Sequence, residues 1–333
     1  MTFISKSAIS KAIKNLDSTK TGSLVKFIIL HTHLGKRRTA RKFAYVLRVL
    51  FAEILPNKPL EVFHSSSYEA ISVMIPCIEK DWPLLPLCLY GIEKNILNHV
   101  KRISVITNNS DLTTNFTSDI LEIVQEENLI TSDLNRLIDK YVPADRRGWV
   151  IKQILTFKFA YNNLDKYLLV IDADTVLSRP RLFVHNGKQV IVPVVEYNDY
   201  DASTTSITWG SKGASFGISF TSHHVLLQTN LVREMFDEIG GFDKGVEKWL
   251  KSADSVPWSP ISDMHSYGTW LLNSHPKRVV FARWGNIRVS KTFLNQYSEE
   301  SNLEIFQHLL RDFKDYNSIS FHHYLKDGFI GKE

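Results

Sequence analysis

The sequence has little cysteine and no long apolar run. Two cysteines in 333 residues, Cys77 and Cys88, exclude a disulfide-stabilised scaffold and predict reduced core thiols in a cytoplasmic protein. No apolar run approaches the ~20 residues that a membrane-spanning helix needs, and residues 1–20 lack the apolar stretch of a secretory signal. Of all residues, 44% are hydrophobic and 23% are charged, so we expect a globular protein.

Positive charge gathers in the N-terminal part of the chain. Residues 1–60 carry twelve lysines and arginines against two acidic residues, whereas the rest of the chain is net acidic. The spacing of apolar side chains over 36–54 predicts an amphipathic helix with a basic face. Two interpretations are open: this helix packs on the main domain, or it lies on the anionic inner face of a membrane. No recognised nucleic-acid-binding module is present, so nucleic acid is not an expected partner.

The pattern after this basic part is that of an α/β domain. A Pro-x-x-Pro segment at 56–59 separates a helical extension, residues 1–60, from a domain at 61–333. Strand-length apolar runs then alternate with helical patterns, which predicts a mostly parallel sheet flanked by helices. The expected strands are 70–76, 102–107, 166–172 and 189–195, and the expected helices include 84–97 and 148–161. The region 203–216, rich in serine, threonine and glycine, is expected to be a mobile loop that closes over a ligand.

Two aspartates follow one of these strands directly. Asp172 and Asp174 come after the apolar run YLLVI, at the carboxyl end of an expected buried parallel strand, where open α/β sheets bind ligands. Carboxylates two residues apart can reach one hard cation, such as Mg²⁺ or Mn²⁺. The alternative is a strand end whose aspartates are merely solvated. A second Asp-x-Asp triplet, Asp199 to Asp201, lies in a polar segment and is interpreted as a turn.

Four dispersed motifs occur over roughly residues 70–325. They are Val73-Met74-Ile75-Pro76 with Glu79-Lys80-Asp81, the segment RGWVIKQIL at 147–155, the segment IDADTV at 171–176, and Ser262-Asp263 with Tyr267-Gly268. In this combination the chain resembles the GT-A glycosyltransferases, and more closely a largely uncharacterised bacterial family within that class. The resemblance implies a Rossmann-like fold and transfer of a sugar from a nucleotide-sugar donor to a hydroxyl acceptor.

The resemblance also implies ligands and the residues that hold them. The expected donor is a UDP-sugar, the cofactor is Mn²⁺ or Mg²⁺, and the acceptor is a glycan or a lipid-linked sugar in polysaccharide biosynthesis. Asp172 and Asp174 would bind the metal on the donor diphosphate, with Asp172 also reaching the ribose. Pro76 would lie against the nucleotide base, and Asp81 would either bond the base edge or cap the next helix.

A helix that precedes the acidic strand supplies three further candidates. Lys152 would neutralise diphosphate charge, Gln153 would bond a sugar hydroxyl, and Trp149 would line the donor site. The alternative is an ordinary helix with a buried Trp149. An inverting transfer also needs a base that takes the acceptor proton.

The expected base is Asp263, at a position where the similar family has glutamate; the shorter side chain leaves His265 as the alternate base. A further alternative is that Asp263 only caps the helix that follows it. The tail segment 319–324 is expected to be a short strand that ends in His322 and His323. One of these histidines would be a third metal ligand, because adjacent strand residues point to opposite faces; we favour His322.

Rival functions use the same residues differently. The segment 172–176 also fits the nucleophile motif of haloacid-dehalogenase-like phosphatases, in which Asp172 would be phosphorylated. About 100 residues of α/β pattern precede this motif, and no downstream acidic pair follows it, which disfavours that function. A carbohydrate-binding protein without catalysis and a sugar nucleotidyltransferase are further alternatives; the first strand lacks the Gly-rich basic loop that the latter needs.

Overall fold

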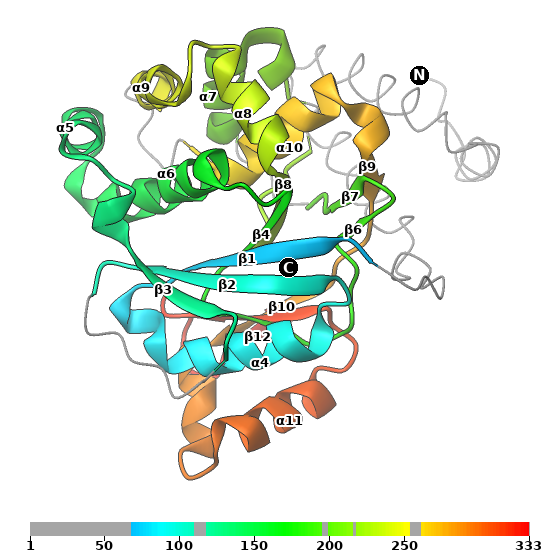
Figure 1. Cartoon of the computed structure of the whole chain (residues 1–333). Coiled ribbons are helices and arrows are strands. Elements are labelled where there is room, and N and C mark those ends of the chain that lie inside the picture. The colour runs from blue at the N-terminus through cyan, green and yellow to red at the C-terminus, as the bar shows by residue number, and fades with distance from the viewer. Residues whose placement is uncertain (1–67, 110–117, 195–198, 216–217, 254–260, 333) are drawn as a thin grey trace, which may run out of the picture.

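The computed structural model describes residues 68–109, 118–194, 199–215, 218–253 and 261–332. The predicted extension 1–60, including the amphipathic helix at 36–54, lies outside these residues. The prediction of an α/β class is confirmed (Figure 1). No helix in the described part of the chain combines the length and the apolar character needed to cross a bilayer.

A five-stranded sheet forms the centre of the molecule. Its strand order is β3 (Leu121–Gln125), β2 (His99–Thr107), β1 (Ala70–Pro76), β4 (Tyr167–Ile171) and β8 (His224–Gln228). The first four strands are mutually parallel, and β8 pairs with β4 in the antiparallel direction. All five residues of β4 are buried, as expected for the apolar run of a central strand that is covered on both faces.

Helices cover both faces of this sheet (Figure 1). One face packs against α6 (Arg147–Asn162), α8 (Thr229–Asp237), α9 (Phe242–Ala253) and α10 (Asp263–Ser274), and α5 (Ser132–Tyr141) lies beside them. The other face packs against α4 (Leu85–Asn95), which follows the 3-10 turn η1 (Glu79–Leu84). The strand residues alternate between the two cores: Leu168 and Val170 of β4 join the first, and Leu169 joins the second. Because successive side chains of a strand point to opposite faces of the sheet, one strand contributes to both hydrophobic cores.

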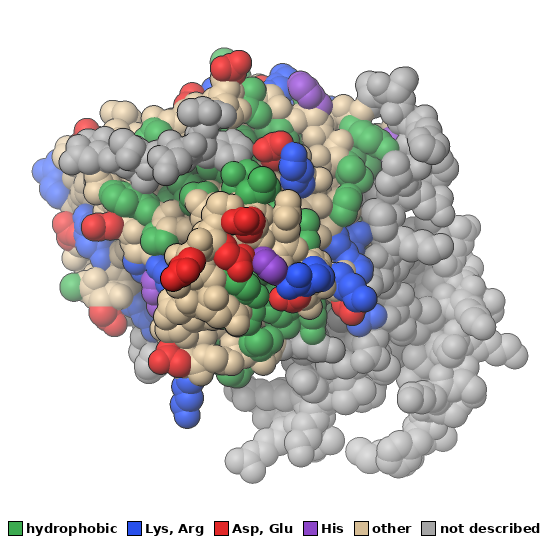
Figure 2. All heavy atoms as spheres, turned by 90° about the horizontal axis from the view of Figure 1, so that it is seen from below, with side chains coloured by type: hydrophobic (Ala, Val, Ile, Leu, Met, Phe, Trp, Pro, Cys, Tyr) green, Lys and Arg blue, Asp and Glu red, His purple; other side chains and the backbone are tan. Residues whose placement is uncertain are grey.

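Two smaller sheets extend the molecule below and beside the central one. The first has the order β12 (Ile330–Lys332), β10 (Asn286–Ser290), β11 (Ser318–His322) and β5 (Thr175–Leu177), and the second has the order β6 (Val184–His185), β7 (Lys188–Ile191) and β9 (Val279–Phe281). The 3-10 turn η6 (Lys291–Tyr297) and α11 (Asn302–Asp312) complete the lower layer, and α11 packs with α4 over a third apolar core. Figure 2, which views the molecule from below, shows acidic and basic side chains interspersed with hydrophobic ones on this face.

The structure changes more than one prediction about secondary structure. The segment 203–216 was expected to be a mobile loop, and this is wrong: most of it forms α7 (Asp199–Trp209) and the 3-10 turn η4 (Gly210–Gly213). The hydroxyl side chains that indicate a loop are used inside the protein. Thr208 donates to the carbonyl oxygen of Thr204 at 2.8 Å, and Thr205 bonds Ser266 of α10 at 2.9 Å. Satisfied in this way, threonine is tolerated in a buried helix. The strand predicted at 189–195 is also shorter than expected: β7 ends at Ile191.

A close approach between α4 and β5 gives a test of the packing. A Cβ on Gly91 would lie 2.8 Å from the backbone nitrogen of Leu177. We predict that Gly91→Ala lowers the free energy of unfolding by about 1–3 kcal/mol, because backbone atoms cannot move aside. Gly148→Ala is the matched control, since its Cβ would meet no atom within 4 Å and alanine favours the helix. Urea unfolding of both variants measures this; equal shifts would contradict the close packing.

Candidate active site

The two aspartates lie where the central sheet reverses its strand order. From β1 the chain proceeds to β2 and β3 on one side, and then returns to β4 on the other side. The crevice outside the carboxyl ends of β1 and β4 is therefore the ligand-binding position that this topology creates. Asp172 follows β4 directly, and a tight turn leads on to β5, in which the amide of Thr175 donates to the carbonyl oxygen of Asp172 at 3.0 Å. This turn holds Asp172 and Asp174 at the crevice.

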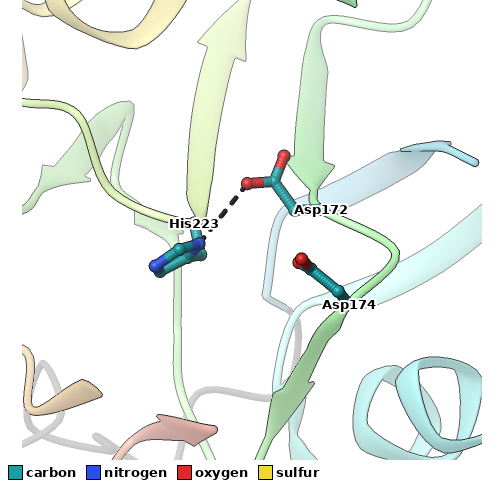
Figure 3. Close-up of side chains that lie close together, drawn as sticks. All are labelled: Asp172, Asp174 and His223. Atoms are coloured by element: carbon teal, nitrogen blue, oxygen red, sulfur yellow. Dashed lines mark ion pairs between the residues drawn. The ribbon is translucent and has the colours of Figure 1, made fainter. Parts of the chain in front are cut away.

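A histidine joins the two aspartates (Figure 3). One ligand atom from each of Asp172, Asp174 and His223 lies within 4.8 Å of the other two. The Nδ1 atom of His223 is 3.5 Å from Oδ2 of Asp172. His223 immediately precedes β8, and the antiparallel register places His224 opposite Ile171. No local sequence pattern indicates a ligand role for His223, because only this non-local strand pairing brings it to the aspartates.

Lys152 connects this cluster to a third aspartate. Its Nζ atom lies 3.1 Å from Oδ1 of Asp172 and 3.6 Å from Oδ2 of Asp263. Burial opposes the charge of Lys152, but the two carboxylates outweigh it and raise the pKa of Lys152 above its ordinary value. Burial likewise opposes ionisation of Asp172, but Lys152 and His223 prevail and lower the pKa of Asp172 to about 2. The negative charge of Asp172 is therefore compensated by Lys152 and His223.

Asp174 is in the opposite electrostatic situation. No ion-pair partner for it occurs among the residues that the structure describes. Burial, and then the negative charge of Asp172, raise the pKa of Asp174 to about 7. A cation beside Asp174 would supply the missing positive charge, and two carboxylates with one imidazole are a suitable donor set for Mn²⁺ or Mg²⁺. The residues present thus fit a divalent metal.

The predicted residues of α6 hold the start of α10. The side-chain carbonyl of Gln153 accepts from the backbone amide of Asp263 at 2.9 Å. The indole nitrogen of Trp149 donates to the carbonyl oxygen of Ile261 at 3.2 Å. The alternative of a buried tryptophan is wrong, because Trp149 is 42% exposed. Trp149, Lys152 and Gln153 therefore lie together along the side of the site that α6 forms.

Of the two candidate bases, only Asp263 lies at the cluster. The alternative that Asp263 merely caps α10 is wrong, because Ser262 is the N-cap residue and accepts from the amide of His265. Asp263 is 1% exposed, and burial raises its pKa. His265 instead packs against Phe220, with a distance of 6.1 Å between ring centroids. Burial lowers the pKa of His265 to about 4.

The two tail histidines point in different directions, as expected for neighbours at a strand end. His322 is buried at the end of β11, and its ring centroid lies 5.3 Å from that of His223. His323 instead bonds Asp81, with 3.1 Å between Nε2 and Oδ1. The alternative that Asp81 caps the next helix is wrong, because Asp81 lies inside η1 and the N-cap of α4 is Leu84. Pro76 ends β1 at the same edge of the sheet.

Comparison with known proteins adds a weak structural similarity. No protein-family model matches the chain, and no curated protein matches it. Among solved structures, the chain is similar to the galactosyltransferase LgtC in complex with donor and acceptor sugar analogs. The sequence identity is 12%, the match covers 77% of this chain and 88% of that chain, and the TM-score is 0.44. A similarity at this level does not assign a function.

The ion pairs of Lys152 give a test of the site. We predict that Lys152→Met lowers the free energy of unfolding by about 3 kcal/mol, because it leaves the buried carboxylate of Asp263 without its cation and removes one partner of the half-buried Asp172. Lys158→Met is the matched control on the same helix, since its partner Asp243 is 84% exposed; its expected effect is below about 1 kcal/mol. Denaturant unfolding in EDTA at pH 7 compares the two, and a similar loss in both variants would contradict the arrangement.

Proposed function

We propose that the chain is a metal-dependent glycosyltransferase of the GT-A type, which moves a sugar from a nucleotide-sugar donor to a hydroxyl acceptor. The observation that carries this proposal is the grouping of Asp172, Asp174 and His223 at the crevice between β1 and β4. A nucleoside diphosphate bound there would meet a metal site, and Lys152 lies beside it. The four sequence motifs support the same function, since each contributes a residue near this crevice.

The residues divide into those that hold the donor and those that act on the acceptor. Asp172 and Asp174, with His223 or His322, would hold Mn²⁺ or Mg²⁺. The cation would supply positive charge against the departing nucleotide diphosphate. Pro76, Asp81, Trp149 and Gln153 would line the donor site; this assignment rests on their motifs and on their positions at the crevice.

Asp263 is the proposed base of an inverting transfer. Its raised pKa suits a group that takes a proton from the acceptor hydroxyl. His265 is the weaker candidate, because it packs in the interior against Phe220. The proposed donor is a UDP-sugar, and the proposed acceptor is a glycan or a lipid-linked sugar in polysaccharide biosynthesis. Contact of residues 36–54 with the inner face of a membrane stays a prediction, as does the cytoplasmic location.

Thermal unfolding of the full chain tests the proposal directly. We expect one of UDP, GDP, CMP and dTDP to raise Tm by several degrees, and only with Mn²⁺ present. A ligand at 100 times its Kd stabilises a protein by about 2.7 kcal/mol, which is enough to detect. If none of the nucleotides shifts Tm, the proposal fails. Hydrolysis of an aryl phosphate would then favour the phosphatase alternative, with Asp172 as nucleophile.

The metal ligands are tested by Asp174→Asn. We predict that this variant loses the Mn²⁺-dependent shift and all sugar transfer, because an amide cannot replace the charge of the carboxylate. Without Mn²⁺ it should be at least as stable as the wild type, since the substitution removes repulsion from Asp172. Asp315→Asn, at an exposed carboxylate, is the control and should keep the full shift. An unchanged Mn²⁺ response in Asp174→Asn would place the metal elsewhere.

A further inference from the structure

Two helices bring a second buried aspartate to the site. α7 with η4 runs parallel to α10, because Thr205 bonds Ser266 at 2.9 Å and, seven residues later in both segments, Asn273 donates to the carbonyl oxygen of Lys212 at 2.9 Å. Asp201 lies one turn before Thr205, and Asp263 lies one turn before Ser266. Residues one turn apart share a helix face, so both aspartates lie at the same end of the contact between these helices.

The hydrogen-bonding capacity at this end is incomplete. Asp201 is 7% exposed, and its Oδ1 atom has no hydrogen-bond partner among the described residues. Gln153 is fully buried; its carbonyl oxygen holds the amide of Asp263, and its Nε2 atom likewise lacks a partner in the described structure. Buried polar atoms without partners are costly and uncommon in proteins. One acceptor atom on Asp201 and one donor atom on Gln153 are therefore unused in the described structure.

The chemistry of these open groups matches a sugar hydroxyl. A hydroxyl can donate to the carboxylate of Asp201 and accept from the amide of Gln153. The position also agrees, because Lys152 connects the metal cluster to Asp263, and Asp201 lies at the same end of the α7–α10 contact as Asp263. The group attached directly to a donor diphosphate is the sugar that is transferred. We propose that Asp201 is a further donor-binding residue, which accepts a hydrogen bond from a hydroxyl of the transferred sugar.

This inference rests on the proposed function and adds a residue to it. The polar segment around Asp201 predicts a turn, and this is wrong because Asp201 lies in the first turn of α7. Burial, and then the charge of Asp263, raise the pKa of Asp201 to about 7. The charged group that acts on Asp201 is Asp263 of α10, which in turn contacts Lys152 of α6. A carboxylate kept in such a position costs stability, which is common for residues retained for binding.

A stability measurement distinguishes a binding residue from a structural one. In the absence of ligand, we predict that Asp201→Asn raises Tm relative to the wild type. Because the folded-state pKa of Asp201 lies above its unfolded value, the wild type loses stability as pH rises from about 4 to about 7. The advantage of the variant should therefore grow over this range and then stay constant. A lower Tm in Asp201→Asn at pH 7 would show a structural role and overturn the inference.

Binding by titration calorimetry supplies the decisive comparison. The full chain with Mn²⁺ is titrated with UDP, UDP-glucose, UDP-galactose, GDP and GDP-mannose. For the nucleotide that binds, Asp201→Ala and Asp201→Asn should weaken the sugar-carrying form about ten- to hundredfold, the loss expected for a hydrogen bond to a charged group. Both variants should bind the free nucleotide as the wild type does. Thr208→Val, two turns along the same buried helix, is the control and should leave both affinities unchanged.

Each other outcome has a definite meaning. If the variants bind nucleotide and nucleotide-sugar as the wild type does, or lose both equally, Asp201 does not contact the sugar and the inference fails while the proposed function stands. If the wild-type chain binds none of these compounds, the proposed function fails and the inference fails with it.

Discussion

The position of Lys152 between the half-buried carboxylate of Asp172 and the buried carboxylate of Asp263 is the constraint on which the site depends. Asp172 comes from the end of β4 and Asp263 from the start of α10, so the ammonium group of α6 joins three elements that are distant in the sequence. Without this cation, burial of the Asp263 carboxylate would be strongly unfavourable. Gln153 and Trp149 reinforce the same junction through the backbone near Asp263. The helix that compensates the charge therefore also fixes the geometry of the site.

The negative charges of the carboxylates at this site are only partly compensated by neighbouring cations. Asp172 has two cationic or ionisable partners and a pKa of about 2, whereas Asp174 and Asp201 each have a pKa of about 7. The first of these uncompensated carboxylates fits a metal ion, and the second fits a hydroxyl group. Perturbed groups of this kind concentrate at functional sites. In the proposed function, the diphosphate of the donor would bind at Asp174 through a metal ion, and the sugar of the same donor would bind at Asp201.

The topology of the sheets explains why these groups meet. Parallel strands bring the ends of β1 and β4 to one edge, and the antiparallel strand β8 enters from the opposite direction with His223 at its beginning. The second sheet pairs β11 with β5, the strand that follows Asp174, and so brings His322 next to His223. Two sheets thus contribute to one cluster, and the tight turn between β4 and β5 joins them.

The sequence alone determined the features that depend on local pattern. The strand 70–76, the helix near 148–161 and the acidic end of β4 follow from apolar periodicity and from residue type, and Asp172 and Asp174 were identified from them. Lys152 was a candidate only through the resemblance of its motif to the GT-A glycosyltransferases. Only the tertiary structure decided the positions of His223 and Asp201 near the aspartates of the site and the interior position of His265. His223 reaches Asp172 through strand pairing across about fifty residues, and the serine- and threonine-rich α7 has no apolar period because its hydroxyls bond neighbouring helices. Such contacts join segments that are distant in the sequence, so no local sequence pattern predicts them.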